Sequence, residues 1–423
     1  MIEKILTQKQ IESFSKKRNE PHFILDKRLN SFSSFEKING TDFPVYFNDI
    51  NFNKLNIENE IIDSNEIHFH LTNENLQLSS LTLLNGKFFE QTSSDEFKNS
   101  KIILCDTNTA IKNFPNLIEK YFSKNIPINE DKLVALNSSM FDGGNFLYVP
   151  KNTNLVLPLQ TLNQFNNSNS LLNPRNLIIV EEQSSLTFVE YLFSSENVIN
   201  TFINSTTELF VGESSKLNYL SLQELNLHTN YKNFKRAILK KDSAISWVEV
   251  SFGGKNSFQH IETYLEGTRS DAEIIGIYFT ENSQQMGFKT LQKHISPHTS
   301  SNLLFKGILK DNSKTFYEGL IKVHKGAQKT NAYQKNQNIL LSENANADSL
   351  PELEIEADDV KCTHGATVGP INQEDLFYLQ TRGLNKHDAI HLLTIGFLKE
   401  AIDKISVQSV KDEVLNFIEK RLE

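Results

Sequence analysis

Hydrophobic and polar residues alternate along the middle of the chain, and the alternating segments recur at regular intervals. Three of them align without gaps and begin 31 and 28 residues apart: residues 180–191, 211–222 and 239–250. The fifth position is serine in every copy, and the ninth is aromatic: Phe188, Tyr219 and Trp247. Alternation with a period of two is typical of a strand with one buried face. Each copy therefore predicts a strand, a polar turn and a second strand.

Weaker copies follow at residues 261–279, 303–317 and 319–341. Periods of roughly 30 residues are typical of solenoids, propellers or arrays. The repeat predicts a mainly β fold, a parallel β-helix whose coils stack like side chains in rows. An antiparallel sandwich, whose strands also recur at even spacing, is the alternative. We expect an N-terminal mixed α/β region over residues 1–105, the β-helix core over 106–364, and a C-terminal helical domain over 365–423.

Both flanks of the repeat carry helical patterns. Residues 3–20 place Ile11 and Phe14 on the stripe of an amphipathic helix, and short strands are expected at 43–47 and 67–71. In the tail, Asn372 and Asn385 are start signals for two helices, and a third follows Ser409. The tail is suited to capping one end of a solenoid. Because the second of these helices is apolar beyond one stripe, it is expected to offer a face to a partner.

Charge and cysteine content limit the function classes. The formal net charge of −9 argues against a general nucleic-acid binder, which needs clustered Lys and Arg. No apolar run approaches the roughly 18 residues of a membrane span. The two cysteines lie far apart without a CxxC pair, and the first residues lack the features of a secretory signal. These observations predict a cytoplasmic protein without structural disulfides.

Cys362 and His364 form the main candidate site. On a strand, residues two apart project from the same face, so a thiol and an imidazole would point at one spot. Two ligands cannot complete a tetrahedral metal site, and the remaining ligands must come from elsewhere. The alternative is that His364 is a surface or packing residue and Cys362 a small buried residue. Cys105 follows an apolar run and is expected in the core.

Two further patterns bear on function. His294 and His298 are four residues apart, but Pro297 breaks the helix that would place them together, which disfavours a zinc site. Glu352, Glu354 and Glu356 alternate with other residues as on a solvated strand face. Carboxylates on a β-helix also occur in polysaccharide lyases and hydrolases, so a β-helix carbohydrate-active enzyme is the alternative function.

Three long blocks carry a family resemblance: residues 326–342, 351–369 and 376–384, with Pro174-Arg175, Glu190-Tyr191 and Lys306-Gly307 upstream. They resemble the SufB/SufD family of iron–sulfur cluster assembly proteins over about residues 130–423. The Lys-Cys-Thr-His-Gly-Ala-Thr block at 361–367 is similar to the SufD branch. The resemblance implies a right-handed parallel β-helix and a complex with a SufB-like subunit and a SufC-like ABC ATPase.

The resemblance also implies site residues. His364, and less strongly Cys362, would be ligands of a nascent iron–sulfur cluster that is shared with SufB and held transiently; the isolated chain would hold none. The C-terminal helices would dock SufC through five apolar residues: Phe377, Leu392, Leu393, Phe397 and Leu398. ATP hydrolysis would belong to SufC, because this chain lacks a phosphate-binding GxxxxGK[ST] loop. The expected function is a non-catalytic scaffold, with a homodimeric adaptor as a further alternative for the isolated chain.

Overall fold

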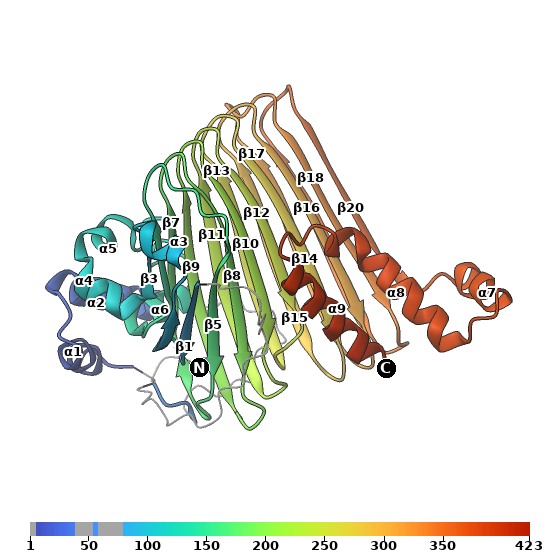
Figure 1. Ribbon diagram of the computed structural model, residues 1–423, viewed down its shortest axis with the longest axis horizontal. Coiled ribbons are helices and arrows are strands. Elements are labelled where there is room, and N and C mark those ends of the chain that lie inside the picture. Colours follow the sequence, from blue (N-terminus) through green and yellow to red (C-terminus); the bar gives the residue numbers. More distant parts are fainter. Residues whose placement is uncertain (1–5, 39–53, 58–78) are drawn as a thin grey trace.

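The computed structural model describes residues 6–38, 54–57 and 79–423. The strands predicted at 43–47 and 67–71 lie outside these residues. A stack of long strands forms the body of the molecule, with one group of helices at its N-terminal end and another beside its C-terminal half (Figure 1). The described helices are α1 (Gln8–Lys17), α2 (His22–Lys37), α3 (Asp95–Asn99), α4 (Thr107–Asn113), α5 (Pro115–Tyr121), α6 (Lys132–Met140), α7 (Gln373–Thr381), α8 (Lys386–Ile402) and α9 (Gln408–Leu422).

The strands form two sheets. Sheet I runs in the order β2 (Lys87–Thr92), β1 (Ser79–Leu84), β5 (Leu159–Phe165), β8 (Ser185–Ser194), β10 (Lys216–Glu224), β12 (Ala244–Ser251), β14 (Asp271–Thr280), β16 (Ser300–Leu309), β18 (Asn331–Leu340) and β20 (Lys361–Pro370). Sheet II runs in the order β19 (Asn346–Ile355), β17 (Lys314–Val323), β15 (Gln285–His294), β13 (Asn256–Leu265), β11 (Thr229–Leu239), β9 (Thr201–Val211), β7 (Arg175–Val180), β4 (Asn145–Val149) and β3 (Ile103–Asp106); the short β6 (Leu171–Leu172) also pairs with β9.

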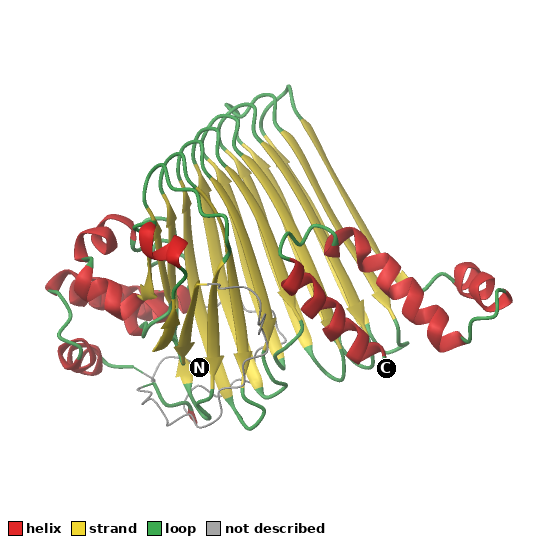
Figure 2. Cartoon of the chain, viewed as in Figure 1, coloured by secondary structure: helices red, strands yellow, loops and turns green. Residues whose placement is uncertain are grey.

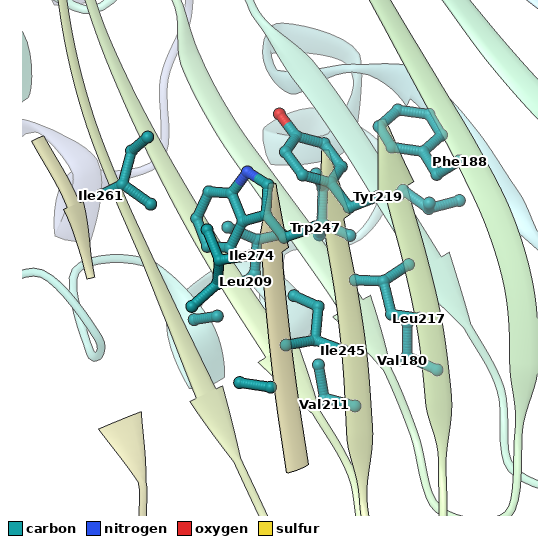
Figure 3. Packing of buried hydrophobic residues seen from close by; sticks show 14 of the residues in the cluster. Val180, Phe188, Leu209, Val211, Leu217, Tyr219, Ile245, Trp247, Ile261 and Ile274 are labelled. Carbon is teal, nitrogen blue, oxygen red and sulfur yellow. The ribbon is translucent and has the colours of Figure 1, made fainter. Parts of the chain in front are cut away.

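From β7 onward, successive long strands alternate between the sheets, and neighbours within each sheet are parallel. This arrangement is a parallel β-solenoid and not a sandwich. Equivalent positions of the sequence repeat lie side by side in the solenoid. Phe188, Tyr219 and Trp247, for example, are paired neighbours on β8, β10 and β12. Their side chains stack in the space between the sheets, hereafter the lumen (Figure 3). The ring centroids of Tyr219 and Trp247 are 5.5 Å apart with an edge-on geometry that favours aromatic attraction.

The repeated serine marks a recurring turn. The residue before it has left-handed backbone geometry, with φ of 56° at Gln183, 56° at Ser214 and 57° at Asp242. In the first two copies, the hydroxyl of the following serine bonds to the preceding coil; Ser215 Oγ, for example, donates to the Glu181 carbonyl of that coil at 2.6 Å. It also accepts from the Ser184 backbone N–H of the preceding coil at 3.1 Å. The serine therefore satisfies backbone groups that the turn leaves unpaired.

Helices α8 and α9 lie along the side of the solenoid, whereas α7 lies beyond its last strands (Figure 2). Helices α8 and α9 pack on the outer face of sheet I, so the strands of this sheet bury apolar residues on both faces. The helices contribute Leu398, Ala401, Ile402, Val410, Val414, Ile418 and Leu422, and the strands contribute Tyr191, Leu222, Val250, Ile277 and Ile308. The expectation that the tail caps an end of the solenoid is therefore wrong. Lys306 anchors α8, since its Nζ donates to the Phe397 carbonyl at 2.8 Å and pairs with Glu400 at 2.7 Å.

Within the described ranges, no helix combines the length and apolar character that a bilayer crossing requires.

Candidate functional site at the open end of the solenoid

The last coil of the solenoid is left uncovered by the other residues that the structure describes. Strands β19 and β20 are the final members of their sheets, and neither has a further neighbour among the residues that the structure describes. The register places Leu353, Ile355 and Val368 on the lumen side of these strands. They are 37%, 40% and 42% exposed, although residues at the same positions of the preceding coils are buried. The last coil therefore exposes both apolar side chains at lumen positions and the unpaired backbone edges of β19 and β20.

Cys362 lies on β20, opposite Ala332 of β18. It is half-buried and packs into a small apolar cluster with Ile321, Val323 and Ala327. Burial raises the pKa of the Cys362 thiol, and a hydrogen bond with the backbone of Ala332 opposes that rise only in part. A neutral thiol in this setting is a packing group first, since the thiolate is the form that binds metal.

His364 follows on the same face of β20 and is exposed. It pairs in register with Gln334 of β18, whose side chain is buried in the lumen. The structure therefore brings Cys362 and His364 to one face, as predicted. Across residues 6–38, 54–57 and 79–423, no group of three or more His, Cys, Asp or Glu side chains could hold a metal ion. The described residues therefore do not by themselves supply a complete ligand set for a cluster at this place.

The five predicted docking residues have different environments. Phe377 on α7 and Leu392 on α8 are 69% and 51% exposed, whereas Leu393 and Phe397 are half-buried. Leu398 is fully buried against sheet I, so it belongs to the core and cannot contact a partner in this structure. Leu398 lies on the face of α8 that packs against sheet I. Tyr378, beside Phe377, is 56% exposed and was not among the predicted residues.

The other candidates have structural roles. His294 is buried, and both ring nitrogens lie 2.8 Å from hydroxyls, those of Thr299 and Ser301. Burial lowers the pKa of His294 to about 3. His298 is an exposed turn residue with a φ of 59°, so the two histidines do not form a site. Cys105 is half-buried and packs against the apolar cluster beneath α4 and α5, and burial raises the pKa of its thiol to about 12.

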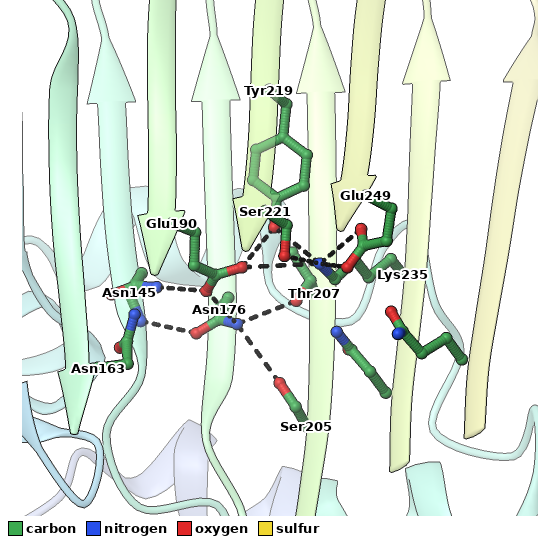
Figure 4. Close-up of polar contacts among 12 residues, drawn as sticks. Asn145, Asn163, Asn176, Glu190, Ser205, Thr207, Tyr219, Ser221, Lys235 and Glu249 are labelled. Carbon is green, nitrogen blue, oxygen red and sulfur yellow. Dashed lines mark hydrogen bonds and ion pairs between the residues drawn. The ribbon is translucent and has the colours of Figure 1, made fainter. Parts of the chain in front are cut away.

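Sequence reasoning missed a buried polar network in the lumen (Figure 4). Lys235 Nζ lies 3.0 Å from both carboxylate oxygens of Glu249 and 2.8 Å from Ser221 Oγ. Tyr219 OH donates to Glu190 at 2.5 Å, and Asn145 donates to the other oxygen of Glu190 at 2.7 Å. The sequence feature that could have revealed this network is Lys235, a charged residue at a lumen position of β11.

This network is almost completely removed from solvent. Glu190 and Glu249 are each 1% exposed, and the Lys235 side chain is fully buried. Burial raises the pKa of the Glu249 carboxyl, and the nearby Lys235 ammonium opposes the rise. With two carboxylates against one ammonium, the group relies on the surrounding amide and hydroxyl donors for compensation.

Comparisons with known proteins agree on one family. Residues 163–397 match the family described as "SUF system FeS cluster assembly, SufBD core domain", and residues 2–161 match "SufBD protein N-terminal region". The chain is 30% identical to the iron–sulfur cluster assembly protein SufD of Bacillus subtilis, covering 98% of both chains.

Two other relatives are less similar. The chain is 25% identical to SufB of Bacillus subtilis, covering 94% of this chain and 89% of that one. It is 26% identical to the SufBD family protein ycf24 of Porphyra purpurea, covering 95% and 88%. Since both family regions and a full-length relative match, the chain belongs to the SufBD family of iron–sulfur cluster assembly proteins, and it is more similar to this SufD than to this SufB.

Proposed function

We propose that this chain is a non-catalytic scaffold subunit that pairs with a SufB-like protein through the open end of its solenoid. The uncovered last coil is the observation that carries the proposal. Unpaired strand edges readily add another strand, and the exposed Leu353, Ile355 and Val368 would be buried by such a contact. In isolation, a second copy of the chain could occupy the same surface. No finding favours a carbohydrate-active enzyme.

At this interface, His364 would be a ligand of a nascent iron–sulfur cluster, which is cargo and not a resident cofactor. Imidazole can replace a thiolate on iron, and it changes the potential of the cluster. A ligand set divided between two chains suits a scaffold, because separating the chains weakens the site and releases the cluster. Cys362 is the weaker candidate, since its thiol is half-buried and its pKa is raised.

The ligand assignment is tested by His364→Ala in the complex assembled anaerobically with its SufB-like partner. We expect the subunits to co-purify as before, because His364 is exposed and makes no core contact, while iron and sulfide content falls several-fold. His298→Ala, an exposed turn histidine elsewhere on the solenoid, is the matched control and should leave both unchanged. An unchanged iron content in His364→Ala would remove this residue from the ligand set.

The helical pair α7 and α8 would dock a SufC-like ABC ATPase. Phe377, Tyr378 and Leu392 form the exposed apolar group on this pair, and a charge there should oppose docking. We expect Phe377→Asp or Leu392→Asp to abolish ATPase co-purification but to keep the SufB-like partner. Asn416→Asp, an exposed position on α9, adds the same charge and should have no effect. Retention of the ATPase by both α7–α8 variants would refute this docking surface. The complex would act in the cytoplasm.

A further inference from the structure

The two strand edges at the open end differ in the backbone groups that they present. In a parallel sheet, successive residues of a strand direct their N–H and C=O groups alternately to the two sides of the strand. The Asn346 N–H at the start of β19 donates toward β17, to the Ser313 carbonyl at 3.1 Å. Just after β19, the Glu356 N–H donates to the Val323 carbonyl of β17 at 2.9 Å. The even-numbered residues of β19 therefore bond to β17, and the odd-numbered residues direct their backbone groups outward.

Pro351 interrupts the row of outward donors on β19. It is the middle member of that row, and proline has no backbone N–H. The outward-facing residues of β19 are Ala347, Ser349, Pro351, Leu353 and Ile355. The outer face of the same strand carries the exposed carboxylates of Asp348, Glu352 and Glu354. Proline and charged side chains protect edge strands from pairing with a further strand, so the edge of β19 is protected.

Strand β20 presents an unbroken row of outward donors. The Lys361 N–H at its start donates toward β18, to the Thr330 carbonyl at 2.9 Å. The odd-numbered residues of β20 therefore bond to β18, and the even-numbered residues face outward. The outward N–H groups are those of Cys362, His364, Ala366 and Val368. The outer face after Lys361 is uncharged, and the strand's one proline is its last residue, Pro370. This edge thus lacks the protective features of β19.

We propose that an extended strand of the SufB-like partner continues sheet I at β20, while β19 accepts no strand; this inference rests on the proposed function. A strand with an uncharged central part fits this edge, because the outer face of β20 offers no charge after Lys361. Neighbouring strands lie about 4.8 Å apart, so lumen-facing side chains of the added strand would lie beside Cys362 and His364. Leu353 and Ile355 of β19 would be covered by side-chain contacts alone.

Ala366→Pro tests the β20 edge, because it removes one outward N–H and directs the proline ring at the added strand. The bonds from β20 to β18 are kept, and β19 already contains a proline in the same orientation, Pro351. We expect the dissociation constant for the SufB-like partner to rise at least about tenfold, measured by isothermal titration calorimetry with the full chain. Ala347→Pro is the matched control, since it removes an outward N–H of β19. Ala347→Pro should change the constant less than about twofold.

Hydrogen exchange in the unmodified complex gives a second measurement, which does not depend on the folding of a variant. Partner binding should slow the fast-exchanging amides of a peptide covering residues 361–369 at least about tenfold. A peptide covering residues 346–355 should change less than about threefold, because the outward N–H groups of β19 gain no hydrogen-bond partner.

Two results would overturn the proposal. One is equal slowing of exchange in both peptides, or slowing in β19 alone, which would show that the partner does not select β20. The other is weaker self-association of Ala366→Pro with unchanged partner binding, which would assign the β20 edge to a second copy of the chain. If the unmodified chain and the SufB-like protein form no complex, the proposed function itself is refuted, and this inference with it.

Discussion

At the N-terminal end of the solenoid the lumen is closed, whereas at the C-terminal end it is open. Phe97 of α3 and Ile102 join the lumen cluster at the first coils and are 8% and 7% exposed. Ile355 and Val368 occupy lumen positions of the last coil and are 40% and 42% exposed. Apolar side chains of the lumen are thus buried at the N-terminal end and exposed at the C-terminal end.

A buried ion pair near the N-terminal end also contrasts with an exposed pair at the open end. Near the N-terminal end, Arg175 and Glu208 are both fully buried and 2.5 Å apart. Glu208 also accepts hydrogen bonds from backbone N–H groups, such as that of Asn125 at 2.9 Å. At the open end, Lys329 pairs with Asp359, and both side chains are more than half exposed. The charged groups of the pair near the closed end are thus removed from solvent, whereas those of the pair at the open end remain in contact with it.

The largest effect is expected from breaking the buried pair. Glu208→Ala leaves the Arg175 charge buried without a carboxylate partner and leaves backbone donors unsatisfied. Removing one member of such a pair costs roughly 3–5 kcal/mol of unfolding free energy. Denaturant unfolding of the variant and the unmodified chain measures this difference.

Asp359→Ala at the open end is the matched comparison. Its exposed pair should contribute at most about 1 kcal/mol. Equal losses in Glu208→Ala and Asp359→Ala would contradict the distinction between the two ends.

A smaller effect should appear as a dependence on pH. Burial alone would raise the pKa of Glu262, but a hydrogen bond with His260 and the charge of Arg236 lower it to about 2. Arg236 also binds Glu130, in the segment that leads to α6 at the closed end. Because the folded pKa is depressed, this carboxylate stabilises the fold above its ordinary pKa of 4.5, and the stabilisation is lost as the pH falls through about 2.

The shift corresponds to about 3 kcal/mol at most. Glu262→Gln should therefore be less stable at neutral pH and lose less stability between pH 4.5 and 2, measured by denaturant unfolding at each pH. Glu354→Gln, at an exposed position of β19 near the open end, is the control and should keep the dependence of the unmodified chain. A parallel loss in Glu262→Gln and the unmodified chain would contradict the role of this carboxylate.

The sequence was most informative where a local rule repeats. Stacking forces like residues into register, so the alignment of Phe188, Tyr219 and Trp247 is sufficient to predict the coil. Asn372 and Asn385 cap α7 and α8 as predicted, because capping depends only on neighbouring backbone donors. The pairing of Cys362 and His364 on one face followed from strand geometry alone.

Placement across the fold was not predictable in this way. Strand segments such as the one around Tyr191 are apolar on both faces, and the sequence does not say which element covers the second face. For this reason the tail was expected on an end of the solenoid, and Leu398 was expected on a free surface. Lys235 lacked a visible partner, since Glu249 reaches it from the opposite sheet.

The smallest effect compares the two cysteines, one near each end. At pH 8, about one in ten thousand Cys105 thiols is ionised if its pKa is about 12, and the side chain lies beneath helices. Cys362 also has a raised pKa, and both cysteines are half-buried, but Cys362 lies beside the open face. We expect a thiol reagent to modify Cys362 at least about tenfold faster than Cys105. Peptide mass spectrometry after timed iodoacetamide treatment measures both rates.

Cys105→Ser and Cys362→Ser assign the signals, and equal rates would show that the open end exposes its thiol no more than the closed end does. Protection of Cys362, but not of Cys105, by a SufB-like partner would place that partner on the open end.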